Sequence, residues 1–84
     1  MENLSEIGTI DHFYSKIDVA VINLTAPLKV GDTIVIKGST TDLEQMVDSM
    51  QVEHQDIEAA ESGQSVGLKA KGKVREGDKV YKKV

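Results

Sequence analysis

The fold is decided by the stretch Leu28-Lys29-Val30-Gly31-Asp32-Thr33-Ile34-Val35-Ile36-Lys37-Gly38. Its turn, Val30-Gly31-Asp32, predicts a chain reversal, because glycine tolerates positive φ and an aspartate side chain can hydrogen-bond a nearby backbone amide. The residues that follow, 33–36, are all β-branched, and such side chains favour an extended, pleated backbone. A weaker copy of the pattern lies at 74–81. Two Gly-Asp turns, each opening a short strand, predict a small barrel or sandwich.

Alternating apolar and polar side chains predict further strands. The predicted strands cover 6–14, 17–24, 33–37, 65–70 and 79–82, and the first two form a hairpin. Residues 1–5 precede the first strand and are expected to be disordered. A chain of 84 residues is long enough for one domain, which we expect to span 1–84.

Residues 43–61 permit two interpretations. Helix-forming residues are dense there, no glycine or proline occurs between 39 and 62, and the apolar residues from Leu43 to Met50 recur at helical spacing. Polar and apolar side chains also alternate along 45–52, as they do in a strand. The local pattern favours the helix, and the strand stays open as the alternative.

The composition excludes several classes of site. The chain contains no cysteine, so it has no disulfide, no thiolate nucleophile and no Cys-ligated metal. This suits a reducing cytoplasm, where we expect the protein. The first six residues lack the basic and apolar regions of a signal peptide, and no apolar run approaches the length of a membrane span. We therefore expect no membrane partner.

No catalytic motif is recognisable in the chain. Gly67 and Gly72 have the glycine spacing of a phosphate-binding loop and Lys73 follows, but Val74 stands where that loop needs a hydroxyl group. The two histidines are too few for a zinc site in a chain without cysteine. The sequence therefore predicts that the protein is not an enzyme and has no catalytic residue, no metal site and no small-molecule cofactor.

Basic residues gather in the last part of the chain. Residues 69–84 hold seven of the ten lysines and arginines, whereas the net charge of the whole chain is −4. In a strand, Lys69, Lys71 and Lys73 would project from one face in steps of about 6.5 Å, a spacing suited to phosphates. With Arg75 they are the predicted RNA-binding residues. The alternative is a solvated face that keeps an edge strand soluble.

The order of these elements resembles domain 2 of the translation GTPases, the β-barrel of elongation factor Tu and initiation factor 2. The resemblance includes the central turn and strand, an alanine-rich turn into a Gly-x-x-Val-Gly-Leu strand, and a closing Arg-x-Gly-Asp-x-Val. The matching segments are 7–10, 28–38, 47–51, 59–68 and 74–80, so that nearly the whole chain is covered. The same barrel is also an accessory domain in other proteins, including the C-terminal part of some U32-family peptidases.

The resemblance implies an all-β fold, a small closed six-stranded barrel in which 44–54 is a strand and a short helical turn lies near 56–60. It also places Gln51 and His54 near the positions that hold the aminoacyl end of tRNA in the elongation factor, although neither matches the residue type found there. The GTPase domain is absent. We therefore expect a stand-alone translation-factor-like module that binds rRNA or tRNA.

A second interpretation rests on the acidic body and the small size of the chain. Both suit a protein–protein docking module that partners an enzyme, a GTPase or another translation-associated protein on a separate chain. RNA contact led by phosphates would weaken steeply with salt, whereas a protein partner would survive RNase.

Overall fold

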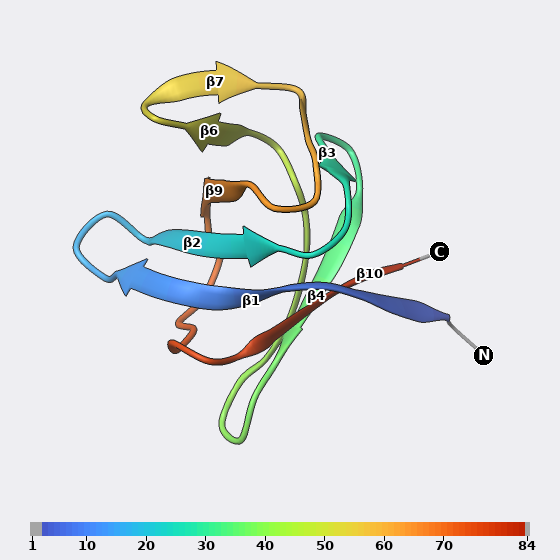
Figure 1. Cartoon of the computed structure of the whole chain (residues 1–84). Helices are drawn as coiled ribbons and strands as arrows, with labels where there is room; N and C mark the ends of the chain where they lie inside the picture. The colour runs from blue at the N-terminus through green and yellow to red at the C-terminus, as the bar shows by residue number, and fades with distance from the viewer. Residues whose placement is uncertain (1–2, 84) are drawn as a thin grey trace.

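The computed structural model describes residues 3–83, which form strands and turns and no helix (Figure 1). The predicted all-β class is therefore confirmed. The strands are β1 (Leu4–Tyr14), β2 (Val19–Leu24), β3 (Leu28–Lys29), β4 (Thr33–Lys37), β5 (Asp42–Met46), β6 (Met50–Val52), β7 (Gln55–Ile57), β8 (Ala59–Ala60), β9 (Ser65–Lys69) and β10 (Lys79–Lys83). Over the described range, accordingly, no helix has the length and apolarity of a membrane span.

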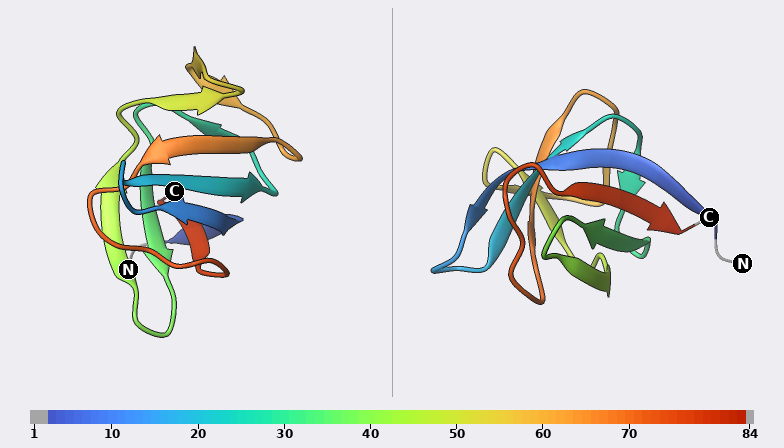
Figure 2. Two further views of the ribbon diagram at one scale, coloured as in Figure 1. Left: turned by 90° about the vertical axis from the view of Figure 1, so that its left-hand side faces the viewer. Right: turned by 90° about the horizontal axis from the view of Figure 1, so that it is seen from below.

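Eight of these strands form one antiparallel sheet in the order β5-β4-β10-β1-β2-β9-β6-β7, and β3 pairs separately with β8. β5 and β6 belong to one continuous segment, 42–52, yet they lie near opposite ends of this order. The sheet therefore curls around the core (Figure 2). Within residues 3–83 the ladder does not close, because β5 pairs with β4 alone and β6 pairs with β7 and β9. The predicted closed six-stranded barrel is wrong.

The core fills the inside of this curl. Alternate side chains point into it, so that Val66 and Leu68 of β9 are buried while Ser65 and Lys69 are exposed. The largest fully buried side chains are Ile7, Ile10, Ile22, Leu28, Ile34, Ile36, Met50, Val47, Val66 and Val80. Each such burial stabilises the fold by on the order of 1.5–3 kcal/mol relative to an exposed side chain.

The two Gly-Asp turns form as predicted. Gly31 has a φ of 98°, and the carboxylate of Asp32 accepts a hydrogen bond from the Lys29 amide at 3.0 Å. The turn at 77–78 repeats both features. The first turn is also tied to the β5–β6 segment, because the Gly31 amide donates to the Val47 carbonyl oxygen at 2.9 Å. This contact holds the organising turn against the part of the chain whose conformation the sequence left open.

The predicted helical turn at 56–60 is wrong. Gln55–Ile57 is strand β7 and Ala59–Ala60 is strand β8. Glu53 and His54 have φ angles of 51° and 66°, and this turn folds β7 back onto β6. Pairing between segments outweighs a helix preference that amounts to tenths of a kcal/mol per residue.

The segment expected as one strand over 44–54 is extended but interrupted, because β5 ends at Met46 and β6 begins at Met50. The disorder expected for 1–5 is wrong for residues 4 and 5. β1 begins at Leu4, which pairs with Lys83 of β10. Residues 1 and 2 lie outside the described residues.

Candidate functional site

The predicted row of lysines on one strand face does not form. β9 ends at Lys69, so Lys71, Lys73 and Arg75 lie in the loop beyond it. The ladder with β2 ends at the pair of Val19 with Lys69, and the next amide, that of Ala70, donates to the carbonyl oxygen of Asp18 at 2.7 Å in the β1–β2 turn. Only residues of β9 itself alternate between the two faces of a strand, so of the three lysines only Lys69 has the predicted position.

Four of the six predicted site residues nevertheless border one surface depression. Lys69 and Lys71 line one end of it, and Gln51 and His54 line the other. Lys73 and Arg75 are not among the residues that line it, although they were predicted with the other lysines.

Three cavities of about 490, 290 and 280 Å³ adjoin one another along β9, and the last of them opens at its edge, beside the buried Val47 and Leu68. Neighbouring cavities share lining residues, Gly67 for the first two and Lys69 for the last two. We call the continuous depression the β9 groove. Its middle is lined by Gly67, its β2 side by Val19 and Val21, and its β6 side by Ser49 and Gln51.

The groove exists because the central strand carries no side chain at its midpoint. Gly67 pairs with Val21 of β2 on one side and with Gln51 of β6 on the other. A Cβ atom added to Gly67 would lie 3.5 Å from Cγ1 of Val19 and 3.9 Å from the carbonyl oxygen of Gln51, which are ordinary contact distances. The position therefore accepts a Cβ atom in ordinary contact with its neighbours, and a larger side chain there would extend into the groove.

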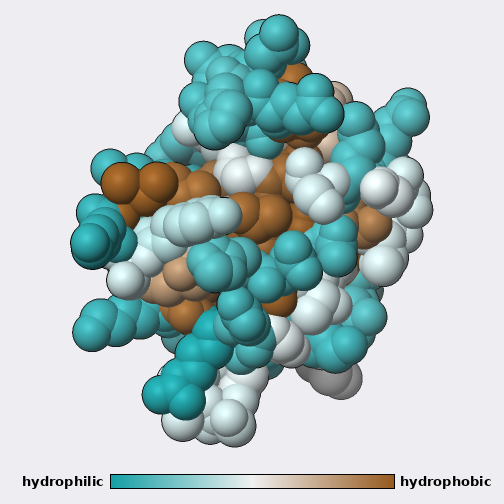
Figure 3. Space-filling view, turned by 60° about the vertical axis from the view of Figure 1, so that its left-hand side comes forward, coloured by the Kyte–Doolittle hydropathy of each residue, from teal (hydrophilic) through white to brown (hydrophobic). Residues whose placement is uncertain are grey.

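Apolar side chains border the groove on the side of the β1–β2 turn. Tyr14 is 50% exposed and Ile17 is 61% exposed, and Val19 and Val21 are half-buried. Figure 3 shows this kind of surface, with apolar residues in a band across the molecule and polar residues on both sides of it. Exposed apolar surface with a polar rim is characteristic of a binding site.

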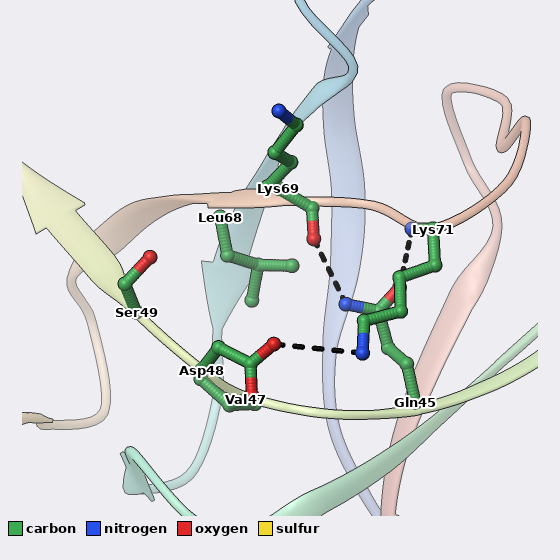
Figure 4. Close-up of a pocket in the computed structure, with 7 residues that line it drawn as sticks. All are labelled: Gln45, Val47, Asp48, Ser49, Leu68, Lys69 and Lys71. Atoms are coloured by element: carbon green, nitrogen blue, oxygen red, sulfur yellow. Dashed lines mark hydrogen bonds and ion pairs between the residues drawn. The ribbon is translucent and has the colours of Figure 1, made fainter.

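The end of the groove near Lys69 lies at the seam between the β5–β6 segment and β9 (Figure 4). Here the side chain of Gln45 takes the place of a backbone ladder. Its Nε2 donates to the carbonyl oxygen of Lys69 at 2.8 Å, and its Oε1 accepts from the amide of Lys71 at 2.7 Å. Lys71 Nζ also forms an exposed ion pair with Asp48 at 3.5 Å. Leu68 points into the space between these groups (Figure 4).

The chemistry of the groove is that of non-covalent binding. It combines apolar walls with the amide of Gln51, the hydroxyls of Ser49 and Ser65, and charged groups at the two ends. Gln51 is itself fixed by a hydrogen bond from its Nε2 to Asp56 Oδ1 at 3.0 Å. In the described part of the chain, no group of three or more histidine, aspartate or glutamate side chains is placed to hold a metal ion.

Sequence reasoning missed the residues at the centre of this site, Gly67, Tyr14 and Gln45. One signal was present. Both faces of the second strand are apolar, with Val19 and Val21 on one and Ala20 and Ile22 on the other. A strand of a curled sheet needs one apolar face for the core, so the second apolar face indicates a surface available for binding.

Comparison with known proteins shows which proteins this chain is similar to. No protein-family model matches the chain. The chain is 52% identical over 77 residues to a protein of Methanocaldococcus jannaschii named as an uncharacterized protease, covering 90% of this chain and 19% of that protein. It is 38% identical over 78 residues to a collagenase of Porphyromonas gingivalis, covering 90% of this chain and 22% of that protein. The chain spans about a fifth of the length of the curated relatives it matches.

The solved structures agree with these relatives. The C-terminal domain of a Geobacillus thermoleovorans protein described as a U32 peptidase superposes with a TM-score of 0.87 at 17% identity, covering 93% of this chain and 91% of that one. Its selenomethionine variant gives 0.86 at 16% identity, covering 90% and 96%. This chain has the fold of a U32 peptidase C-terminal domain.

These findings correct the functional predictions. The predicted translation-factor family and the rRNA- or tRNA-binding module are wrong, because the relatives are a protease and collagenases and the structural neighbour is a peptidase domain. The prediction that the protein is not an enzyme is contradicted by the same names, which indicate an enzyme-related protein. In each relative the matching segment is part of a single longer protein, and docking to an enzyme on a separate chain stays a prediction for this chain.

Proposed function

We propose that this chain performs the role of the C-terminal domain of a U32-type peptidase, and that its β9 groove holds a segment of the polypeptide on which the peptidase acts. The 52% identity to a protein named as a protease carries the peptidase part of this proposal. The open apolar groove along β9 supports the polypeptide-binding part. The domain would raise the local concentration of substrate beside the peptidase.

The groove suits an extended segment. It runs parallel to β9, so a chain lying in it would present alternate side chains to its floor, as a strand does. One apolar side chain would lie over Gly67 and contact Val19 and Val21. Gln51 and Ser65, which hydrogen-bond Asp56 and Asn23, would border it. Burying one such side chain gives on the order of 1.5–3 kcal/mol, so we expect weak binding that assists rather than replaces recognition by a peptidase.

Binding of gelatin tests the proposal. Because one relative is named a collagenase, fluorescently labelled gelatin is the first probe, with unfolded casein as a second polypeptide. Gly67→Leu fills the groove and should weaken binding at least fivefold without lowering the melting temperature. Gly67→Ala places a single methyl group at ordinary contact distance and serves as the matched control. Equal binding by Gly67→Leu and the unchanged protein would exclude the groove as the site.

Two further expectations belong to this proposal. We propose that residues 1–84 fold as one unit, since the C-terminal domain that superposes on them is a solved structure of its own. We also propose a cytoplasmic location, which is supported by a chain without cysteine. Reversible two-state unfolding of the isolated chain and fractionation of the source cells test these two statements.

A further inference from the structure

The two ends of the β9 groove carry opposite charges. Glu53 lines the end beside Ser65, and Lys69 lines the end beside Ser49. Both side chains belong to exposed residues, and neither has an ion-pair partner among residues 3–83. Three other ionisable groups near the groove are Lys71, Asp56 and His54, and His54 lines the same end as Glu53. Lys71 pairs with Asp48, and Asp56 accepts a hydrogen bond from Gln51.

The strand register fixes the distance between these two charges. β6 and β9 are antiparallel and Gln51 pairs with Gly67. The cavity linings place Glu53 with Ser65, and Ser49 with Lys69. Glu53 therefore lies about four residue steps along β9 from Lys69. At 3.3 Å per residue this is about 13 Å between their backbone positions. The first and last residues of an extended five-residue peptide are separated by that length.

We propose that the β9 groove selects an extended segment of about five residues that carries a cationic group at one end, an anionic group at the other and an apolar side chain at its middle residue, so that all three face the groove. The cationic group pairs with Glu53, the anionic group with Lys69, and the apolar side chain lies over Gly67 against Val19 and Val21. This rests on the proposed polypeptide-binding function and specifies its ligand. The anionic group is a carboxylate, from an acidic side chain or a free C-terminus, and the cationic group is a basic side chain or a free N-terminus.

The charges act on selection more than on affinity. Both groups are exposed and screened by salt, so each pairing changes binding by roughly two- to fivefold, and both together by roughly four- to twenty-fivefold. A peptide with two like charges gains one pairing and suffers one repulsion. A dipolar peptide gains both pairings. It can do so in either chain direction, because Glu53 and Lys69 recognise its charged groups and not its backbone.

Capped pentapeptides with one apolar middle residue test this proposal. They carry end residues that are basic and acidic, both basic, both acidic, or both neutral, and binding is measured by competition with a labelled dipolar peptide at low salt. The unchanged protein should prefer the dipolar peptide. Lys69→Glu should shift the preference to the doubly basic peptide, and Glu53→Lys to the doubly acidic one. The double variant Lys69→Glu/Glu53→Lys should restore the preference for the dipolar peptide, which a merely unfolded variant cannot do.

Controls separate this inference from the proposed function. Lys37→Glu changes an exposed lysine of β4 that does not line the groove, and it should leave the preference unchanged. An uncapped neutral pentapeptide that binds as tightly as the capped dipolar one would identify chain ends as the charge source. One that binds no better than the capped neutral pentapeptide would identify side chains. Suppose that the neutral peptide binds, that Gly67→Leu abolishes this binding, and that the charge variants do not switch the preferred peptide. The charge selection is then wrong, and the proposal that the groove binds polypeptide is supported. If no peptide and no gelatin binds, both are wrong.

Discussion

The side chain of Gln45 is hydrogen-bonded to the backbone of Lys69 across the seam where β5 and β9 meet without a ladder. The same amide accepts from the Lys71 backbone, so a single side chain supplies both the donor and the acceptor that a neighbouring strand would have supplied. Gln45 is only 6% exposed, which makes both backbone groups dependent on it. The curl of the sheet is held at this point by one residue.

Removing this amide should destabilise the fold. Gln45→Met keeps the length of the side chain and leaves a backbone carbonyl and a backbone amide unpaired, each of which costs about 1–3 kcal/mol. We expect a loss of about 2–4 kcal/mol in the free energy of unfolding, measured by urea denaturation. Gln55→Met is the matched control, because Gln55 is exposed in β7, and it should change stability by less than about 0.5 kcal/mol. A similar, small effect of both substitutions would contradict the seam role of Gln45.

Gly31→Val should destabilise the organising turn. Gly31 has a φ of 98°, and nothing lies within 4 Å of the position its Cβ would occupy, so the cost is conformational rather than steric. We expect a loss of about 1–3 kcal/mol, which thermal unfolding measures. Gly31→Asn should lose less, because asparagine enters the left-handed region more readily than valine does. An order of stability with valine above asparagine would show that φ is not the cause.

Gly8→Ala should be far more harmful than Gly67→Ala. A Cβ on Gly8 would lie 2.9 Å from the Cγ2 atom of Ile22 and would overlap the carbonyl oxygen of Asn23, which belongs to a paired backbone and cannot move freely. A Cβ atom on Gly67 would lie at ordinary contact distances from its neighbours. We expect Gly8→Ala to cost at least about 2 kcal/mol and Gly67→Ala less than about 1 kcal/mol, compared in the same denaturant titration.

The ion pair between Lys71 and Asp48 should contribute little to stability. Its side chains are 58% and 70% exposed and its atoms are 3.5 Å apart, and pairs of this kind are worth about 0.2–1 kcal/mol. A double-mutant cycle with Lys71→Ala and Asp48→Ala should give a coupling energy in that range, and smaller at 1 M salt. A coupling above about 2 kcal/mol would mean that the pair, and not Gln45, closes the seam.

Local chemistry predicted the parts of the fold that depend on neighbouring residues. The Gly-Asp turns and the strand after Gly31 require nothing beyond positive φ, an acceptor side chain and β-branching, and the structure confirms them. The stretch 56–60 was predicted wrongly because its partners, β6 and β3, lie elsewhere in the sequence and decide its conformation. The closed barrel was predicted wrongly for the same reason, because its closure would depend on how the chain after Met46 pairs with strands that are distant in sequence.

The groove was not predictable for a related reason. Its floor and walls come from β2, β9 and β6, and the register among these strands brings Val21, Gly67 and Gln51 side by side. No local pattern specifies that register. The basic residues misled the functional prediction because neighbours in sequence are not neighbours on a surface. Lys69 lies on the groove, whereas Lys73 and Arg75 do not line it.

The pairing of Leu4 with Lys83 has a consequence for how this molecule can be rewired. These two residues are strand neighbours, about 5 Å apart. The start of β1 and the end of β10 lie on the side away from the β1–β2 turn, whose Tyr14 and Ile17 border the groove (Figure 1). A short linker could therefore join them, with new termini cut in the exposed loop after Gly38. Such a circular permutant would change where the chain starts while leaving every residue of the groove in place.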